Sequence, residues 1–304
     1  MNGPSERGAL SVLSERYAGW IEAALAQAIE RGRGKIPPRL LESMAYSLMA
    51  GGKRLRPALC LAVAENCGIS PEAAMPMAAA LEFMHTASLI HDDLPCMDDD
   101  DLRRGKPTNH KAFGECMAIL AGDSLMIWSF GYALSGLIKN GVPADRAARA
   151  AGVLSEASGP EGMCGGQVLD TDPASRTPDS DFVYRIAEKK TAAMIRASVV
   201  TGAIIGGMDE ADVHRVLDYG THLGLAFQIV DDILDATATS EQLGKTPGKD
   251  AAQDKMTFVS AYGLDGARRR AEDESLAAAE ALLPLRDKFG LMIDLAEQLA
   301  HRSN

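Results

Sequence analysis

Apolar residues recur at helical spacing along most of the chain, and no convincing stretch alternates strictly between apolar and polar residues. The first pattern is typical of amphipathic helices and the second of half-buried strands. Connections rich in Gly, Pro and Asp separate the helical stretches. We therefore expect an all-α fold, with helices over residues 8–30, after Pro37, from Ser70 to the acidic segment at Asp92, and over 111–139, 144–157, 179–205, 209–236, 256–283 and 287–302.

The chain shows no sign of division into smaller units. It contains no linker with a shift in composition, no internal repeat and no low-complexity tract. We therefore expect a single all-helical domain over residues 1–304.

The helix expected from Ser70 leads into the most unusual segment of the chain, Ser88 to Pro107. Ser70 is a suitable N-cap, and Pro71 suits the first helical position. The segment carries six aspartates followed by Arg103 and Arg104. So many carboxylates repel one another unless cations lie between them.

These aspartates are spaced for a hard divalent cation. Mg²⁺ typically takes one or two protein carboxylates and completes its octahedron with water and phosphate oxygens, which makes Asp92, Asp93 and Asp98 candidate ligands. Asp92 and Asp98 would lie on different faces of a straight helix, so the helix must end between them, and Pro95 supplies the break. For Asp99 to Asp101, a solvated acidic loop is the simpler interpretation.

A shorter acidic segment, Phe227 to Asp235, lies far downstream. Asp231 and Asp235 are four residues apart and so share one helix face, about 6 Å apart along the axis. Gln228 falls on the same face, either as a ligand contact or as ordinary polar surface. Two such acidic faces could share a metal cluster.

Composition limits the possible partners. With 304 residues, 46% hydrophobic and 24% charged, the chain has an ordinary globular balance. Its net charge of −11 argues against a nucleic-acid or anionic-membrane surface, so an anionic substrate would need metals or local basic clusters. Five cysteines without a C-x-x-C pair make zinc and a disulfide framework poor interpretations and favour a reducing cytoplasm. We find no signal pattern and no uninterrupted apolar run of about eighteen residues, and therefore expect a soluble protein without stable membrane insertion.

Basic residues are few and lie near the acidic segments in the sequence or in the expected helices. In Gly51–Pro57 (GGKRLRP), two glycines allow close approach of a ligand while Lys53 and Arg56 offer phosphate-binding charges. The alternative is a helix end followed by solvated charges. Arg103 and Arg104 beside the aspartates favour anion binding.

Three further positions have both a functional and an ordinary interpretation. His85 lies two turns before Asp92 on a similar helix face, although an isolated helical histidine is more often hydrogen-bonded in the core. Lys190 interrupts an apolar helical run, where a lysine normally extends its ammonium group to solvent. A basic loop containing Lys245 and Lys255 could close over a diphosphate.

Taken in order, the motifs resemble those of the trans-type isoprenyl diphosphate synthases. The resemblance extends from about residue 40 to 258 and implies the isoprenoid-synthase fold, stacked helices around a deep central cavity, usually as a homodimer with the aspartate motifs facing each other. The motifs are GGKRLRP, DDxxxxD (Asp92 to Asp98), LRRGKPT (Leu102 to Thr108), GDSL (Gly122 to Leu125), GGQxxD (Gly165 to Asp170), KT (Lys190-Thr191) and FQxxDDxxD (Phe227 to Asp235).

The resemblance also implies a reaction. Isopentenyl diphosphate would condense head-to-tail with an allylic diphosphate, whose ionisation is assisted by Mg²⁺, about three ions per active site. Pyrophosphate would leave and take the proton, and no side-chain nucleophile is needed. The implied metal ligands are Asp92, Asp98 and Asp231, and the implied catalytic set adds Asp93, Asp232, Asp235 and Lys190. The implied ligands of isopentenyl diphosphate are Lys53, Arg56, His85 and Arg104, and those of the allylic diphosphate are Arg103, Lys190, Thr191, Gln228, Lys245 and Lys255.

Two other functions compete with this one. A terpene cyclase needs one diphosphate site and would leave the GGKRLRP segment without a role. A non-catalytic subunit of a prenyl synthase typically has degraded aspartate motifs, whereas both motifs are intact here.

Product length is expected to depend on the helix that precedes Asp92. Each turn back along it spans about 5.4 Å, close to one isoprene unit. One turn back lie Ala87 and Ser88, neither of which is large enough to close a pocket. Phe83 and Met84, one turn further, are large enough.

We therefore predict geranylgeranyl diphosphate as the product. Farnesyl diphosphate is the alternative if Trp128 or Phe130 of the neighbouring helix reaches in and makes the pocket shallower.

Overall fold

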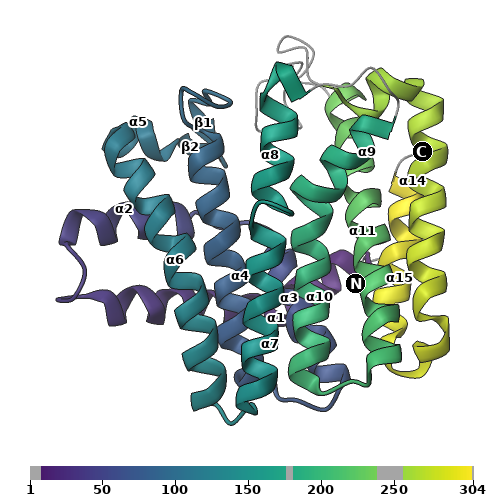
Figure 1. The fold of residues 1–304 in the computed structure, drawn as a ribbon, viewed down its shortest axis with the longest axis horizontal. Helices are drawn as coiled ribbons and strands as arrows, with labels where there is room; N and C mark the ends of the chain where they lie inside the picture. The colour runs from purple at the N-terminus through teal and green to yellow at the C-terminus, as the bar shows by residue number, and fades with distance from the viewer. Residues whose placement is uncertain (1–7, 176–180, 238–255, 303–304) are drawn as a thin grey trace, which may run out of the picture.

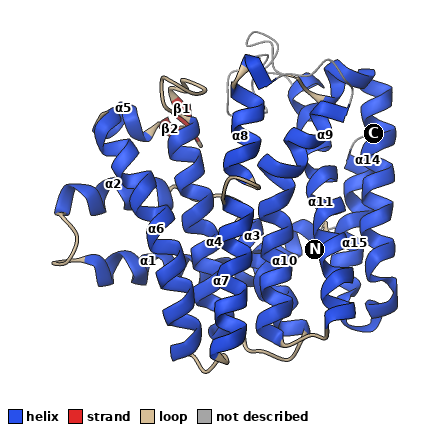
Figure 2. Cartoon of the chain, in the orientation of Figure 1, coloured by secondary structure: helices blue, strands red, loops and turns tan. Residues whose placement is uncertain are grey.

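The computed structural model describes residues 8–175, 181–237 and 256–302 (Figure 1). The described residues are almost entirely helical, as Figure 2 shows, so the predicted all-α fold is confirmed. The longer helices are α1 (Ala9–Gly32), α2 (Pro38–Leu48), α3 (Leu55–Asn66), α4 (Pro71–Asp92), α6 (Glu115–Lys139), α7 (Ala144–Ser158), α8 (Met163–Thr171), α10 (Ala193–Gly206), α11 (Glu210–Thr237), α14 (Phe258–Leu282) and α15 (Arg286–Arg302). The shorter ones are α5 (Asn109–Phe113), η2 (Pro173–Ser175), α9 (Asp181–Ala187), η3 (Glu188–Ala192) and η4 (Leu283–Leu285).

The helices form a continuous series of neighbours. α6 packs on α4, α4 on α3, α3 on α10, α10 on α11, α11 on α14 and α14 on α15, while α1 crosses behind and contacts α3, α4 and α15 (Figure 1). Most buried apolar residues belong to one cluster that draws on α1 through α15. A smaller cluster joins α9, η3, α11 and α14. The helix ends that carry the acidic motifs are thus fixed by extensive packing below them.

The start of α4 agrees with the sequence prediction. The Ser70 side chain accepts a hydrogen bond from the backbone N–H of Ala73, and Pro71 occupies the first turn. The helix ends at Asp92, before Pro95, as predicted. Its burial is nearly complete, since residues on almost every face pack against α3 or α6.

Three features of the helices differ from the prediction. The run 111–139 is broken at Gly114, whose φ of 89° no other residue adopts easily, so that α5 and α6 are separate helices. The run 179–205 contains a π-helical turn, η3, between α9 and α10. Helix α8 was not predicted, because its Gly-rich, nine-residue sequence carries little periodic signal.

The described residues also contain a short hairpin that the apolar pattern did not predict. Strand β1 (Leu102–Arg103) pairs antiparallel with β2 (Lys106–Pro107), and Leu102 lies opposite Pro107. The hairpin follows the acidic segment and lies next to the end of α4 (Figure 1). With two residues in each strand, it is too short to show alternation.

Two of the described helices bear on the expectation that the protein does not insert stably into a membrane. By length and composition, α4 and α6 are both apolar enough to cross a membrane. In α4, 67% of the apolar window is buried inside the protein, as in a core helix, whereas in α6 only 33% is buried. Helix α6 therefore exposes apolar surface that needs an explanation.

Candidate active site

The first acidic motif is arranged around the end of α4. After Asp92 the chain turns back, and the backbone N–H of Asp98 donates to the carbonyl of Asp92 at 2.8 Å. This places the two predicted metal ligands at one helix end although they are six residues apart in sequence. Burial raises the pKa of Asp92 to about 6; the Lys190 ammonium opposes this shift and the Asp98 carboxylate adds to it. A cation bound at this helix end would therefore stabilise the ionised form of Asp92.

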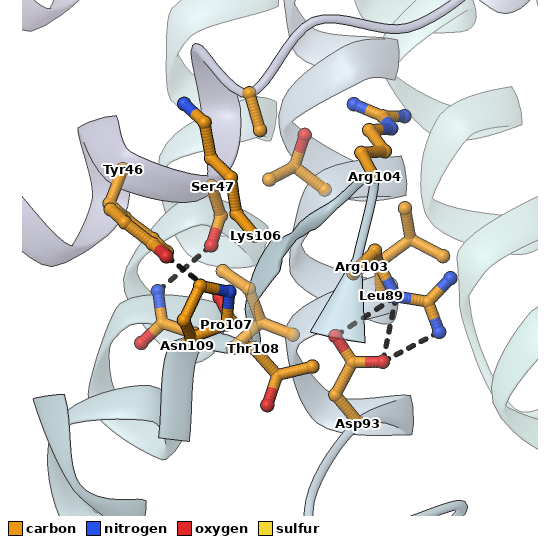
Figure 3. A pocket seen from close by; sticks show the side chains of 13 residues that line it. Tyr46, Ser47, Leu89, Asp93, Arg103, Arg104, Lys106, Pro107, Thr108 and Asn109 are labelled. Atoms are coloured by element: carbon orange, nitrogen blue, oxygen red, sulfur yellow. Dashed lines mark hydrogen bonds and ion pairs between the residues drawn. The ribbon is translucent and has the colours of Figure 1, made fainter. Parts of the chain in front are cut away.

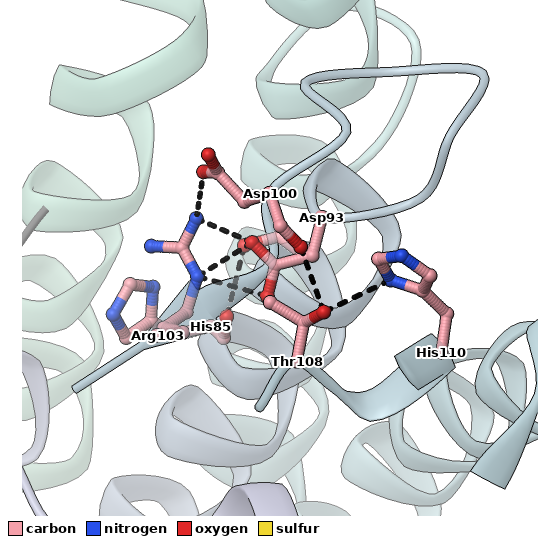
Figure 4. A network of polar contacts seen from close by, with 7 residues as sticks. His85, Asp93, Asp100, Arg103, Thr108 and His110 are labelled. Atoms are coloured by element: carbon pink, nitrogen blue, oxygen red, sulfur yellow. Dashed lines mark hydrogen bonds and ion pairs between the residues drawn. The ribbon is translucent and has the colours of Figure 1, made fainter. Parts of the chain in front are cut away.

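Asp93 has a different environment from Asp92. It is 2% exposed, and Arg103 of the hairpin donates to its carboxylate through Nε at 2.7 and 2.9 Å and approaches it through Nη2 at 2.6 Å (Figure 4). Arg103 also reaches Asp100 at 3.4 Å, and the Thr108 hydroxyl donates to the Asp100 carbonyl at 2.7 Å. Arg103 thus fastens the hairpin to α4. Its guanidinium is thus engaged by two aspartates. The role of Arg103 as a ligand of the allylic diphosphate stays a prediction.

The second acidic motif shows the same division between neighbouring aspartates. On α11, Asp231 is exposed and Asp235 half-buried, whereas Asp232 is buried. Asp232 accepts a hydrogen bond from the Gln228 amide at 2.8 Å and another from the backbone N–H of Phe258 at 2.8 Å. Because Phe258 is the first residue of α14, Asp232 fastens the start of that helix to α11. Gln228 points to Asp232 rather than to Asp231.

The turn η3 places Lys190 and Thr191 between these regions. Lys190 donates to the Asp170 carboxylate of α8 at 2.5 Å, and the Thr191 hydroxyl donates to Gln228 at 2.6 Å. A side chain at Gly166 of α8 would come within 2.3 Å of the backbone nitrogen of Lys190, so only glycine permits this approach. Asp170, which lies in the GGQxxD motif, is a site residue to which the sequence assigned no role.

The predicted isopentenyl diphosphate ligands form a basic cluster. Lys53 is exposed, and Arg56 and His85 are half-buried. The Nε of Arg56 is buried without a hydrogen-bond partner among the described residues, so an anion bound beside it would satisfy this donor. Burial lowers the pKa of His85 well below its ordinary value, and Arg56 and Arg104 add to this effect. His85 is therefore neutral at pH 7.

The two clusters adjoin each other. Arg103 is close enough to lower the pKa of Asp92 and, by repulsion, that of His85. Asp92 also senses Lys190 across the space between α4 and η3. An acidic cluster and a basic cluster therefore lie side by side near the end of α4.

Three of the four residues predicted to set product length are buried, and Ser88 is half-buried. Phe83, Met84 and Ala87 are at most 2% exposed, and Ser88 donates its hydroxyl to the carbonyl of His85. Phe83 stacks on Trp128 of α6 with ring centroids 5.1 Å apart. It also meets the edge of Tyr132 at 5.1 Å, and Trp128 meets Tyr132 at 5.7 Å, so three aromatic rings fill the α4–α6 contact.

A pocket lies between the hairpin and helices α2, α4 and α5 (Figure 3). It spans about 400 Å³, part of it open to solvent, and is lined by Asp93, Arg103 and Arg104 but not by Asp92, Asp98 or Asp231. Its walls already satisfy one another: the Tyr46 hydroxyl donates to the carbonyl of Pro107 at 2.8 Å, and the Asn109 amide to the Ser47 hydroxyl at 2.9 Å. We therefore do not assign the reaction to this pocket.

The described residues fit a role for Mg²⁺ only in part. Among them, no group of three or more acidic, histidine or cysteine side chains is close enough to hold an ion unaided. Mg²⁺ usually relies on one or two carboxylates together with substrate phosphate oxygens, and the paired Asp92 and Asp98 offer such oxygens. Lys245 and Lys255, predicted to form a basic lid, lie outside the described residues.

Comparison with known proteins agrees with these features. The sequence profile of the polyprenyl synthetase family matches residues 37–281. The chain belongs to the polyprenyl synthetase family. It is 47% identical over 285 residues to a dimethylallyltranstransferase of Fischerella ambigua, an alignment covering 93% of this chain and 81% of the relative. It is 46% identical over 272 residues to the heterodimeric geranylgeranyl pyrophosphate synthase large subunit 1 of Arabidopsis thaliana, covering 88% and 73%.

A solved structure supports the same assignment. An FPP/GFPP synthase from Zymomonas mobilis superimposes with a TM-score of 0.82 at 34% identity, covering 96% of this chain and 98% of that one. The predicted family, fold and enzyme class, a trans-prenyltransferase, are confirmed. The comparisons do not test the assignment of individual side chains, which remains a prediction.

Proposed function

We propose that this family member condenses isopentenyl diphosphate head-to-tail with allylic diphosphates and makes mainly geranylgeranyl diphosphate. The observation that carries the proposal is the pair of adjoining clusters of opposite charge: carboxylates at Asp92 and Asp98, and cations at Arg56 and Arg104 around the neutral His85. Two diphosphates can bind in two chemically different ways at such a site. A terpene cyclase would have no use for the basic cluster.

Each cluster suits one of the two substrates. The allylic diphosphate must leave, and Mg²⁺ held by Asp92, Asp98 and Asp231 would neutralise the charge that develops on its oxygens. Lys190, whose ammonium group donates to Asp170, lies close enough to Asp92 to lower its pKa and so lies near the same leaving group. Isopentenyl diphosphate keeps its diphosphate throughout, so Arg56, Lys53 and Arg104 need only hold it.

The condensation needs no nucleophilic side chain. The allylic C–O bond breaks, the isopentenyl double bond forms the new C–C bond, and the resulting cation loses a proton to the departing pyrophosphate. The protein supplies orientation and a dry, apolar surrounding for the allylic cation. The side chains one turn before Asp92, Ala87 and Ser88, are small and would not block a prenyl chain that extended along α4.

The aromatic group on α4 and α6 supports the predicted product length. Phe83 lies more than two turns before Asp92 on α4 and one turn before Ala87. It contacts Trp128 and Tyr132 of α6, which also contact each other. A chain growing along α4 would pass Ala87 and stop at these rings, which favours geranylgeranyl over farnesyl diphosphate. Ala87→Tyr should shift the main product to farnesyl diphosphate, and a variant that still makes mainly twenty-carbon chains would show that the pocket does not follow α4.

Pyrophosphate release with and without isopentenyl diphosphate tests the proposed reaction. We expect release only when both isopentenyl and allylic diphosphates are present. Release from the allylic substrate alone would indicate a cyclase, and no release under any condition would indicate a non-catalytic subunit.

We also propose that the enzyme is a homodimer whose interface includes α6. This helix exposes Ile119, Leu120, Ile127 and Ile138 by 44%, 47%, 74% and 46%. Apolar patches of this kind mark protein contacts, and a second copy of the same face would cover them. Light scattering should give a dimer for wild type and a monomer for Ile127→Glu. A monomeric wild type, or one that binds lipid vesicles through α6, would contradict the proposal.

A further inference from the structure

The loop that presents Lys53 and Arg56 contains a third cation, Arg54, with a different environment. Its side chain is only 2% exposed, and its backbone adopts a left-handed conformation with φ of 48° immediately before α3. A residue other than glycine holds this conformation only where its surroundings enforce it. The contacts of the Arg54 side chain provide such enforcement.

The Arg54 guanidinium joins three helices to the start of a fourth. Nε donates to Glu22 of α1 at 2.7 Å, and Nη2 donates to the carbonyl of Leu48, the last residue of α2, at 2.7 Å. Nη1 donates to the carboxylate of Glu82 on α4. Because Arg54 immediately precedes α3, these three bonds fix the point at which the loop from Gly51 to Arg54 joins that helix.

Glu82 is also the counter-charge of the basic cluster. It is 2% exposed and lies one turn before His85 on α4. Burial lowers the pKa of Arg56 and of Arg104, and in both cases the Glu82 carboxylate opposes the shift. One carboxylate among three arginines lets these cations remain together while leaving an excess of positive charge for a diphosphate.

The hairpin holds the other end of the loop. Arg104 donates to the carbonyl of Gly51, and its guanidinium carbon would lie 2.7 Å from a Cβ placed on Gly52. The loop is therefore held at Gly51 by the hairpin and at Arg54 by the buried carboxylates. Lys53, between these two points, is exposed, and Arg56 follows one turn later with its unpartnered Nε.

We propose that Arg54 and Glu82, assisted by Glu22, are positioning residues for the isopentenyl diphosphate subsite: they touch no substrate but fix Lys53, Arg56 and His85 relative to one another. This inference rests on the proposed function, in which those three side chains bind isopentenyl diphosphate. Losing the hydrogen bonds of Arg54 should selectively weaken the binding of isopentenyl diphosphate. The residues assigned to the allylic diphosphate are held by separate contacts through Asp170 and Gln228.

The test is the Arg54→Lys variant, which keeps the charge but offers its three donors from a single nitrogen and so lacks the planar fork that reaches Glu22, Glu82 and the Leu48 carbonyl. KM for isopentenyl diphosphate should rise about tenfold or more, while KM for farnesyl diphosphate stays within about twofold. Both constants are measured at a temperature where a melting curve shows the variant to be folded. Unchanged KM values with only a lower rate, or an equal rise of both, would overturn the proposal.

A double variant tests whether the effect of Arg54→Lys comes only from leaving the buried Glu82 carboxylate poorly paired. Arg54→Met/Glu82→Met removes both partners of the buried pair together, a change that proteins often tolerate. KM for isopentenyl diphosphate should remain raised about tenfold or more, because the loop has lost its anchor. A return to the wild-type value would show that the pair does not position the loop.

Arg149→Lys serves as the matched control, since Arg149 makes an exposed pair with Glu210 at 2.5 and 2.7 Å and has no contact with the loop. It should leave both KM values unchanged. Failure of the proposed function looks different from failure of this inference: in the first case wild type shows no turnover that depends on isopentenyl diphosphate, and in the second wild type does but the variants lack the selective effect.

Discussion

The two acidic motifs use their aspartates in the same way but with different partners. In each motif the second aspartate of the DD pair is buried and fastens the segment that follows: Asp93 holds the hairpin through the Arg103 guanidinium, and Asp232 holds α14 through the backbone N–H of Phe258. The first aspartates, Asp92 and Asp231, are the ones to which we assign metal binding. The comparison teaches that the members of a run of carboxylates differ in role, because Asp93 and Asp232 hold neighbouring segments in place.

The partners of the two aspartates also differ. Asp93 contacts the charged guanidinium of Arg103, and Asp232 accepts hydrogen bonds from the neutral Gln228 amide and the Phe258 backbone. Hydrogen bonds between charged groups are the stronger class, so each Arg103–Asp93 bond is expected to be stronger than either of these two bonds to Asp232.

The largest expected effect concerns the first aspartates. Asp92→Ala and Asp231→Ala should each lower kcat by about a hundredfold or more, since metal stabilisation of a leaving group is worth several kcal/mol. Neither change removes core volume, so circular dichroism and melting curves should stay near those of wild type. If both variants keep more than about a tenth of wild-type turnover, the metal assignment is wrong.

A smaller effect is expected for the two second aspartates. Asp93→Asn and Asp232→Asn should each destabilise the protein by about 1–3 kcal/mol, because each weakens buried hydrogen bonds that fasten the segment that follows. Urea unfolding measures both. A variant as stable as wild type would show that its aspartate does not fasten that segment.

Much of this arrangement followed from the sequence. Helical periodicity predicted α4 with its Ser70 cap, and the spacing of Asp92 and Asp98 required the helix to end between them, as it does. Both motifs and the basic cluster could be located by residue type alone.

The sequence could not tell which aspartates face inward. Asp92 and Asp93 are adjacent, so their different roles depend on Arg103, which approaches only once the hairpin folds back. Arg54 was missed for the same reason: next to Lys53 and Arg56 in sequence, it shows its role only through Glu22 and Glu82 on other helices. The π-turn at Lys190 depends on the close approach of Gly166, which apolar periodicity does not report.

The smallest expected effect concerns a second tie between α11 and α14. His222 of α11 contacts Glu274 of α14 at 2.7 Å, and this hydrogen bond raises the pKa of His222, with burial opposing and Asp218 adding. The pair stabilises the protein fully below the ordinary value of 6.5, and the contribution is lost as pH rises through the raised folded-state pKa. Glu274→Gln should therefore lower Tm more at acidic than at alkaline pH.

Glu272→Gln, an exposed neighbour on the same helix, is the control and should show no such dependence. A Tm difference for Glu274→Gln that is constant with pH would mean that titration of His222 does not contribute to the tie between α11 and α14.

The central claim, that the two clusters bring two diphosphates together for condensation, is tested most directly by following labelled isopentenyl diphosphate. The purified enzyme is supplied with Mg²⁺, labelled isopentenyl diphosphate and farnesyl diphosphate, and the dephosphorylated products are separated by chromatography. The account predicts that the label appears in the twenty-carbon alcohol. Farnesyl diphosphate that is recovered unchanged, or consumed without incorporation of label, would contradict it.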